Sequence, residues 1–298
     1  MTELRAVGLD VGGSSMRAAE SGDAAAAIRA PVSAATTLAE FIEAAGGLLA
    51  AVDPGGAATV AVALPTFVKP DGTLLDCPSI PALTGVRLAA LMATELGRSE
   101  PLLVPDLAAA VVGESRHGVG LGVDSFLCVA LGTGANAAAT RGGRVVDTAF
   151  GCLGDAGHVL VEPDGPRCSC GGRGCLEAVA SGWALAREAR VIGLRTGEDL
   201  TVAAEQGRED AAAILDRAGV ALGRAVASWS ALLWPEVVAV AGGVSAAGER
   251  LLTPARRELA RVGVPYIAER VTIVPATLGE TATLVGALCL AEDAARAT

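Results

Sequence analysis

Short apolar runs that end in glycine recur along this chain. Residues 5–11 form a β-rich run that stops at a pair of glycines and resumes at residues 16–19, which predicts a strand, a tight turn and a second strand. Residues 125–131 form another apolar run, which enters the turn Gly132-Thr133-Gly134 in the same way. This repetition predicts an internally duplicated chain with one glycine turn at the head of each half.

Between these turns, the apolar positions alternate between helical and strand spacing. We expect helices at residues 38–51, 86–96, 107–115, 211–234 and 282–295. We expect further strands at residues 57–64, 102–104, 237–241 and 272–275. The Pro-containing stretch 65–81 predicts an irregular loop, and Ser245 is expected to cap the helix after Gly242-Gly243. The alternation predicts an α/β fold.

Composition narrows the class of protein. With 298 residues, of which 52% are hydrophobic and only 3% aromatic, the chain can bury a large core of Ala, Val and Leu, and its length suits one two-lobed unit. A formal net charge of −10 disfavours nucleic-acid binding, which depends on Lys and Arg. The first residues lack a signal-peptide pattern and no apolar run approaches a membrane span. We therefore expect a cytoplasmic protein that binds neither nucleic acid nor membrane.

Three of the seven cysteines crowd into one short segment. Cys168, Cys170 and Cys175, together with His158, supply three sulfurs and one nitrogen, the ligand set of a closed structural zinc site. A surface loop with free thiols is the less favoured alternative. The other cysteines lie in apolar surroundings and are expected to be buried core thiols; they are Cys77, Cys128, Cys152 and Cys289.

The first glycine turn carries an acidic side chain at the end of an apolar strand. In Asp10-Val11-Gly12-Gly13-Ser14 the glycines let backbone amides approach an anion, so the turn favours a phosphate with its magnesium. A plain hairpin with a solvated Asp is the alternative for this turn alone. Gly132-Thr133-Gly134 and Gly242-Gly243 offer two more such turns. One nucleotide held in a cleft explains three such junctions better than coincidence does.

Three further acidic residues are candidates for chemistry on a sugar. Asp106 follows a strand end, where it is the N-cap of the next helix, or a general base that takes a proton from a hydroxyl attacking ATP, or both. Asp155 and Glu177 flank the zinc segment, although zinc does not require them. Carboxylates accept hydrogen bonds from sugar hydroxyls, and a metal-anchored loop would hold these two rigidly.

These residues resemble the ROK family of sugar kinases and repressors. The resemblance runs from Leu9-Asp10-Val11-Gly12-Gly13 to Val285-Gly286-Ala287, and it is most specific in Gly157-His158 and in the segment 168–177, CSCGGRGCLE. It implies an actin/hexokinase-type (ribonuclease H-like) duplicated α/β fold with two lobes and a central cleft, and a homodimer. The expected lobes are residues 1–115, joined by a C-terminal helix 285–298, and residues 116–284, which include the zinc segment.

By position, the resemblance gives each candidate residue a role. Asp106 would be the catalytic base for transfer of the γ-phosphoryl group of ATP to a primary hydroxyl, usually the 6-hydroxyl of a hexose. Asp155, His158 and Glu177 would line the sugar site, with His158 serving zinc and sugar through its two ring nitrogens. Asp10 would lie near Mg²⁺. ATP would be held by Asp10, Gly12, Gly13, Ser14, Gly132, Thr133, Gly134, Gly242 and Gly243.

Three departures from the family pattern bear on the substrate. Pro105 stands where family glucose kinases carry an Asn that contacts the sugar 3-hydroxyl, Asp155 where they carry Glu, and Thr66 where a Gly follows Pro65. These positions belong to the side of the sugar around carbons 2 and 3. We therefore expect a glucose analogue altered near carbon 3, such as kanosamine (3-amino-3-deoxyglucose), or glucose itself. Ala135-Asn136-Ala137-Ala138 also replaces further glycines after the second turn, which is expected to weaken ATP binding.

Two other functions share this family resemblance. A repressor would need a DNA-binding domain ahead of the first strand, which begins here almost at once, so we do not expect a repressor. A non-catalytic sugar-binding protein is the stronger alternative, because of Pro105 and the altered second turn. If the protein is an enzyme, replacing Asp106 with Asn should abolish phosphorylation and spare sugar binding.

Overall fold

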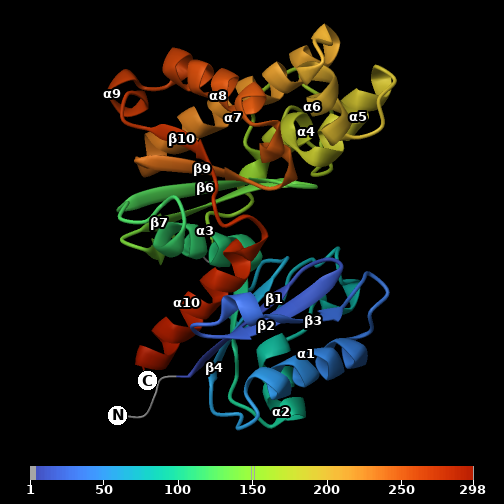
Figure 1. Ribbon diagram of the computed structural model, residues 1–298, viewed down its shortest axis with the longest axis vertical. Coiled ribbons are helices and arrows are strands. Elements are labelled where there is room, and N and C mark those ends of the chain that lie inside the picture. The colour runs from blue at the N-terminus through green and yellow to red at the C-terminus, as the bar shows by residue number, and fades with distance from the viewer. Residues whose placement is uncertain (1–4, 149, 151, 298) are drawn as a thin grey trace. The chain divides into compact units, whose positions relative to one another are not determined.

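The computed structural model describes residues 5–148, 150 and 152–297. The chain divides into two compact units, called here the first and the second unit. The first contains residues up to 121 with 143–154 and 280–298, and the second contains 122–142 and 155–279. Each is built on a sheet with helices packed against it (Figure 1). The lobe limits expected from the sequence, after residues 115 and 284, stay a prediction about domains.

A mixed five-stranded sheet forms the centre of the first unit, in the order β3-β2-β1-β4-β5. β1 pairs antiparallel with β2 and parallel with β4, so it lies in the middle of the sheet. All its residues are buried, as expected for a strand covered on both faces. The strands are β1 (Ala6–Val11), β2 (Ser15–Glu20), β3 (Ile28–Pro31), β4 (Thr59–Leu64) and β5 (Leu102–Pro105).

The two faces of this sheet are covered by side chains of different size. α1 and α2 pack large residues such as Phe41 and Met92 against Leu9 of β1. On the other face α3 and α10 bring in alanines, among them Ala109 and Ala287. Figure 1 shows α1 and α10 on opposite sides of the sheet. The helices are α1 (Leu38–Val52), α2 (Leu88–Leu96), α3 (Asp106–His117) and α10 (Ala282–Ala297), with the 3₁₀ turns η1 (Ala24–Ala26), η2 (Pro81–Leu83) and η5 (Gly279–Thr281).

α3 and α10 approach each other closely because small residues line their contact. A Cβ added at Gly286 would lie 1.7 Å from the Ala109 carbonyl oxygen, so only glycine fits there. This backbone contact fixes the distance between the two helices, since packed interiors transmit displacement rather than absorb it. α3, which begins at Asp106, is therefore held firmly on α10.

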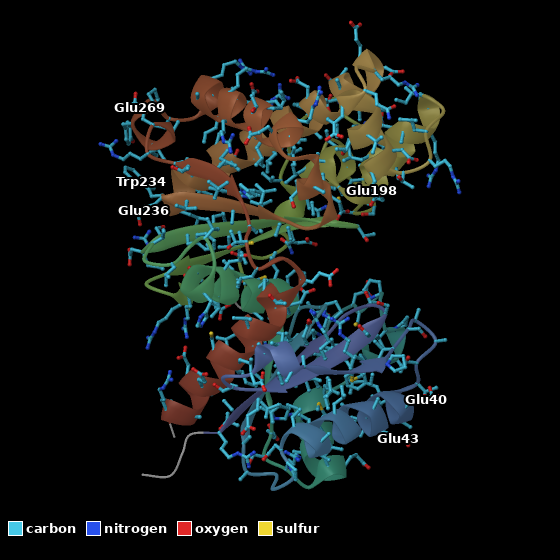
Figure 2. All side chains as sticks on the ribbon, viewed as in Figure 1. Glu40, Glu43, Glu198, Trp234, Glu236 and Glu269 are labelled. Atoms are coloured by element: carbon cyan, nitrogen blue, oxygen red, sulfur yellow. The ribbon has the colours of Figure 1, made fainter. Side chains whose placement is uncertain are left out.

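The start of α1 shows how local sequence sets a helix boundary. The Thr37 hydroxyl accepts the Glu40 N–H at 3.3 Å, and the Glu40 carboxylate accepts the Thr37 N–H at 2.8 Å. This reciprocal capping box satisfies two amides that the helix leaves unpaired. Glu40 is labelled on α1 in Figure 2. The expected helix start at residue 38 is confirmed.

The second unit repeats the arrangement of the first. Its sheet runs in the order β10-β9-β6-β7-β8, with β6 antiparallel to β7 and parallel to β9. The strands of this sheet are β6 (Ser125–Leu131), β7 (Ala135–Arg141), the short edge strand β8 (Arg144–Val145), β9 (Val237–Ala241) and β10 (Thr272–Pro275). Its helices are α4 (Leu176–Ala180), α5 (Gly182–Val191), α6 (Gly197–Glu205), α7 (Glu209–Leu233), α8 (Glu249–Val262) and α9 (Pro265–Ala268), with the 3₁₀ turns η3 (Ala156–His158) and η4 (Gly243–Ala247).

Strand register identifies equivalent positions in the two sheets. Asp10 of β1 lies opposite Arg17 of β2, and Ala130 of β6 lies opposite Asn136 of β7. Each pair is the last but one before the glycine turn. Strand order and strand directions agree as well, so the duplication expected from the sequence is confirmed.

Most expected elements lie within two residues of their expected limits, and the stretch 65–81 lacks regular structure up to η2. The expected helix cap at Ser245 is wrong. The Ser245 hydroxyl donates to the Gly242 carbonyl at 2.7 Å, and Gly248 occupies the N-cap of α8. Residues 135–138 begin β7, where they pair with β6. Within the described ranges, no helix is long and apolar enough to cross a membrane.

Candidate functional site

Four metal-ligating side chains come together in the second unit. The ligand atoms of His158, Cys168, Cys170 and Cys175 all lie within 4.8 Å of one another. The Cys168 Sγ lies 3.5 Å from the His158 Nδ1, and the Cys170 Sγ lies 3.7 Å from the Cys175 Sγ. Tetrahedral zinc with bonds of about 2.3 Å to sulfur and about 2.1 Å to nitrogen requires separations of about 3.6 Å and about 3.8 Å. The four residues therefore fit a closed structural zinc site.

The His158 turn is fixed to β7 by one close contact and one hydrogen bond. A Cβ added at Gly157 would lie 1.7 Å from the Ala135 carbonyl oxygen, so only glycine lets η3 lie this close to the strand. The Asn136 Oδ1 accepts the Ala156 N–H at 2.9 Å. The Gly157-His158 pair in the sequence thus has a physical reason, because the glycine allows the approach that positions the histidine.

The two ring nitrogens of His158 face different partners. Nδ1 faces the thiols, and Nε2 lies 3.3 Å from the Asp155 Oδ2. The Asp155 side chain is 53% exposed and that of His158 is 24% exposed. A histidine that binds metal through Nδ1 carries its proton on Nε2, where it donates to an oxygen. The geometry is compatible with the double use of His158 expected from the sequence.

Glu177 lies at the start of α4, between the zinc segment and the second glycine turn. Its Oε2 accepts the Ala135 N–H at 3.2 Å, and its Oε1 accepts the Ser169 hydroxyl at 2.9 Å. A carboxylate has about four acceptor positions, so these two bonds leave room for further donors. Ser169 is a contact that metal spacing alone did not point to.

Asp106 opens α3 directly after β5 in the first unit. Pro105 occupies the N-cap position, so Asp106 is the first helical residue and not the cap that the sequence suggested. Its carboxylate accepts the Leu107 N–H at 2.6 Å. Burial raises the pKa of Asp106 to about 6; the Leu107 hydrogen bond opposes this shift and the negative charge of Asp10 adds to it. Such a carboxylate is ionised at neutral pH and can still take up a proton.

Asp10 lies near the end of β1 and is 7% exposed. It forms an ion pair with Arg17, whose Nε donates to the Asp10 Oδ2 at 3.2 Å. Burial raises the pKa of Asp10, while Arg17 and, more weakly, Arg29 act in the opposite direction. A buried carboxylate of this kind needs a cationic partner to stay ionised.

The first glycine turn has free amides. The Gly12 N–H closes the hairpin on the Ser15 carbonyl at 2.9 Å. The amides of Gly13 and Ser14, both exposed residues, have no hydrogen-bond acceptor among the described residues. Free N–H groups in a turn form a concave surface that binds anions.

The second turn shares this property. The Gly132 N–H bonds the Gly134 carbonyl at 3.0 Å, and the amides of Thr133 and Gly134 find no acceptor in the part of the chain that the structure describes. The third turn, Gly242-Gly243, is exposed at the end of β9. Within the second unit, two glycine turns therefore present backbone at neighbouring strand ends, because β6 and β9 are parallel and paired.

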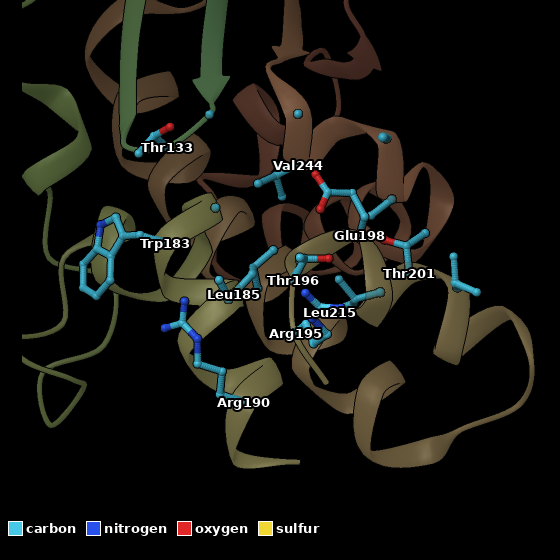
Figure 3. Close-up of a pocket in the computed structure, with 18 residues that line it drawn as sticks. Thr133, Trp183, Leu185, Arg190, Arg195, Thr196, Glu198, Thr201, Leu215 and Val244 are labelled. Carbon is cyan, nitrogen blue, oxygen red and sulfur yellow. The ribbon is translucent and has the colours of Figure 1, made fainter. Parts of the chain in front are cut away.

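A pocket of about 710 Å³ adjoins these two turns. Thr133 and Gly243 lie on its wall, with Trp183 from α5 and Thr196 and Glu198 from the start of α6 (Figure 3). The volume is in the range of pockets that hold small-molecule ligands and cofactors. The walls formed by α5 and α6 were not predicted from the sequence. Thr196 followed by Asp199 is a capping-box signal that would have placed the start of α6.

The remaining candidates lie in the first unit. Thr66 is buried, and its hydroxyl donates to the Asp76 carbonyl at 2.8 Å, so it holds its own loop together. Pro65 ends the strand region that precedes this loop and is partly exposed. Pro105 is buried at the N-cap of α3. None of the three presents a carboxylate or amide side chain, in contrast to Asp155 and Glu177 in the second unit.

Comparison with known proteins accounts for this set of residues. The sequence model of the ROK family matches residues 6–294, nearly the whole chain. The chain belongs to the ROK family. The resemblance drawn from the glycine turns and the zinc segment is therefore confirmed.

Within the family, this ROK protein is similar to several named kinases in sequence and in structure. The glucokinase of Thermotoga maritima is 34% identical over 241 residues, 76% of each chain. The kanosamine kinase of Amycolatopsis mediterranei is 32% identical over 243 residues, 78% of this chain and 76% of the relative. The ROK family glucokinase from Streptomyces griseus, crystallised with glucose and AMPPNP, matches with a TM-score of 0.77 at 28% identity, over 97% of this chain and 99% of that one. The expected actin/hexokinase-type two-lobe fold is confirmed.

Proposed function

We propose that this protein is an ATP-dependent hexose kinase. The observation that carries the proposal is Asp106, a carboxylate of raised pKa at a strand-to-helix junction in the unit that also contains Asp10 and an amide-lined glycine turn. The relatives named glucokinase and kanosamine kinase support the same chemistry. The reaction transfers the γ-phosphoryl group of ATP to the 6-hydroxyl of a hexose, giving a sugar 6-phosphate and ADP.

Asp106 would act as the general base of this transfer. As the sugar oxygen bonds to the γ-phosphorus, its O–H bond breaks and the proton passes to the Asp106 carboxylate. The bond from the γ-phosphorus to the bridging oxygen breaks and ADP leaves with that electron pair. With a pKa of about 6, Asp106 is mostly ionised at neutral pH and is a stronger base than an ordinary Asp.

In the second unit, the second and third glycine turns would contact the nucleotide, and the first glycine turn offers the same kind of phosphate contact in the first unit. The free amides of Thr133 and Gly134 are suited to phosphate oxygens, and the adjoining pocket is large enough for a nucleoside. Mg²⁺, when bound, neutralises charge on the phosphate oxygens. Asp10 offers the hard oxygen donor that this ion prefers.

The proposed sugar contacts are the residues that the family resemblance assigns to the sugar. Zinc would have a structural role, since four protein ligands leave no open position. Asp155 is an exposed carboxylate beside His158, and it is suited to pair with an ammonium group. This supports a glucose analogue altered near carbon 3, such as kanosamine. The proposed contacts are Asp155, His158, Glu177, Pro65, Thr66 and Pro105.

ADP release measured over glucose, kanosamine, mannose and N-acetylmannosamine tests the activity. We expect sugar-dependent turnover in the wild type and a loss of at least about 10³-fold in Asp106→Asn, which keeps an acceptor for the Leu107 N–H. Asp71→Asn is the matched control, because Asp71 is an exposed carboxylate that accepts the Thr73 N–H at 3.0 Å. Sugar binding by calorimetry without ADP release from any sugar would identify a sugar-binding protein instead.

Substrate preference is tested separately by kcat/KM for glucose and kanosamine. We expect the wild type to prefer kanosamine, and Asp155→Glu, which restores the longer side chain of family glucose kinases, to move the preference toward glucose. Asp164→Glu, in the same segment and exposed, should leave the preference unchanged. A clear wild-type preference for glucose contradicts the amino-sugar proposal and leaves the kinase proposal intact.

A further inference from the structure

Arg17 of the first hairpin and Asn136 of the second hairpin occupy equivalent positions in the duplicated fold. Arg17 lies on β2 opposite Asp10, just as Asn136 lies on β7 opposite Ala130. In the second unit, Asn136 reaches past its strand to hold η3 and with it the His158 turn. Arg17 occupies the equivalent position in the first unit, and it too contacts a segment outside its own hairpin.

Arg17 has two partners that lie far apart in the sequence. Its guanidinium forms an ion pair with the Asp10 carboxylate. Its Nη2 also donates a hydrogen bond to the Glu280 carbonyl oxygen at 2.6 Å. The side chains of Arg17 and Asp10 are 14% and 9% exposed. Hydrogen bonds in which the donor or the acceptor is charged are among the stronger ones in proteins, and here water has little access to them. The charged groups that face Asp10 are Arg17 from β2, Arg29 from β3 and Asp106 from α3.

Glu280 is the residue at which the chain returns to the first unit. It lies in η5, immediately before α10, and α10 packs on β1 and on α3. Through Glu280, Arg17 therefore connects the strand beside the first glycine turn to the start of α10, the helix that packs on α3, where Asp106 lies. A planar guanidinium can serve a carboxylate and a carbonyl at once, whereas the single ammonium of Lys does not reproduce this fork.

We propose that Arg17 is a positioning residue for phosphoryl transfer, which fixes the Asp10 carboxylate beside the first glycine turn and anchors the start of α10 through the Glu280 carbonyl. The proposal rests on the kinase function proposed above. Arg17 touches neither substrate in this assignment; it acts through Asp10 and through the helix pair that carries Asp106.

Arg17→Met tests the proposal, because Met fills similar space and has no donor. We expect kcat to fall at least about tenfold with the sugar KM unchanged, and the Mg²⁺ concentration for half-maximal rate to rise. Hydrogen exchange supplies a readout that does not depend on activity, and the amides of residues 282–286 should exchange about tenfold faster. Arg29→Met is the matched control: Arg29 lies opposite Arg17 on β3, is exposed and acts on Asp10 only through its charge, so all three measurements should change much less than in Arg17→Met.

Arg17→Lys separates the two contacts. It keeps a cation for Asp10, so kcat should recover partly, while exchange at the start of α10 should stay fast because the fork is lost. If Arg17→Met does not fold, the comparison of Arg17→Lys with Arg29→Met decides alone. Equal kcat, Mg²⁺ dependence and exchange in the Arg17 and Arg29 variants would overturn the proposal.

The outcomes also separate this inference from the proposed function. Absence of sugar phosphorylation by the wild type removes the kinase, and the exchange measurement still reports whether Arg17 anchors α10. An active wild type with an unaffected Arg17→Met variant removes the positioning role and leaves the kinase in place.

Discussion

The two glycine hairpins of this ROK protein share strand order and register and differ in the charge beside the turn. In the first, a buried Asp10 stands opposite Arg17; in the second, the equivalent pair is Ala130 and Asn136. In the first hairpin, the buried Asp10 carboxylate needs the Arg17 cation beside it. In the second hairpin, the residue at the position of Arg17 is Asn136, whose side chain is a neutral amide. In both, the residue on the second strand reaches out to hold another segment. The two hairpins therefore share the position of the residue that contacts another segment, but they differ in the charge of that residue and of its partner.

This difference agrees with the work proposed for each unit. The first unit holds the carboxylates of raised pKa, Asp10 and Asp106, which suit metal and proton chemistry. The second unit holds the metal cluster, the amide-lined second turn and the pocket, which suit binding. The following predictions test this contrast between the carboxylates of the first unit and the binding features of the second.

Loss of the metal should give the largest effect, and it should act on the second unit. We expect Cys170→Ser to lose zinc and to lower Tm by about 10 °C, because structural zinc contributes folding free energy directly. Thermal unfolding together with metal analysis measures both quantities. Cys170 is exposed, so its replacement would cost almost nothing in the absence of a metal. An unchanged Tm, or a wild type insensitive to chelator, would therefore refute the zinc site.

The raised pKa of Asp106 predicts the pH dependence of the first unit's chemistry. If its ionised form is the base, kcat/KM should fall about tenfold per pH unit below pH 6, and stay level from pH 7 to 8. Initial rates between pH 5 and 8 give this profile. A rate that stays level down to pH 5 would show that no group with a pKa of about 6 controls the rate.

The same shift makes a statement about stability. The folded carboxyl binds its proton more tightly than the unfolded one, so the folded state loses stability as pH rises from 3.8 to about 6, and carries that cost at neutral pH. Asp106→Asn should therefore stabilise the protein by about 1–3 kcal/mol at pH 8, with the gain vanishing near pH 4. Denaturant unfolding at the two pH values measures the gain. A loss of stability at pH 8 would contradict the burial of an ionised carboxylate.

The smallest predicted effect concerns the neutral pair of the second hairpin. Asn136→Ala leaves the Ala156 N–H without its acceptor, which should cost about 1–2 kcal/mol of stability and raise the sugar KM several-fold, with kcat little changed. Asn136→Asp retains the oxygen and is the control. The comparison between the hairpins fails if Asn136→Ala lowers kcat and spares KM, as expected of Arg17→Met.

Features written in neighbouring residues could be predicted from the sequence. The zinc ligands Cys168, Cys170 and Cys175 lie within eight residues, and the glycine turns follow directly from the strands that end in them. Asp106 was found because it follows an apolar strand. Arg17 was open to prediction, since an antiparallel hairpin with a short turn places it opposite Asp10.

Other features depend on segments that the sequence keeps apart. Ser245 looks like a helix cap in the sequence, and the fold uses its hydroxyl on the Gly242 carbonyl. The pocket walls from α5 and α6 could not be placed on the glycine turns, because no local pattern records that packing.

The sequence by itself determined the kind of protein: a duplicated α/β chain of the ROK family with a cysteine and histidine cluster and acidic residues at strand ends. The elements and the cluster follow from periodicity and spacing, which act over a few residues, and the family follows from the resemblance of the motifs. Only the tertiary structure decided what each polar group does. Burial set the pKa of Asp106, and folding brought the Arg17 guanidinium to a carbonyl 263 residues away. Desolvation and long-range hydrogen bonds exist only once the chain has closed around them.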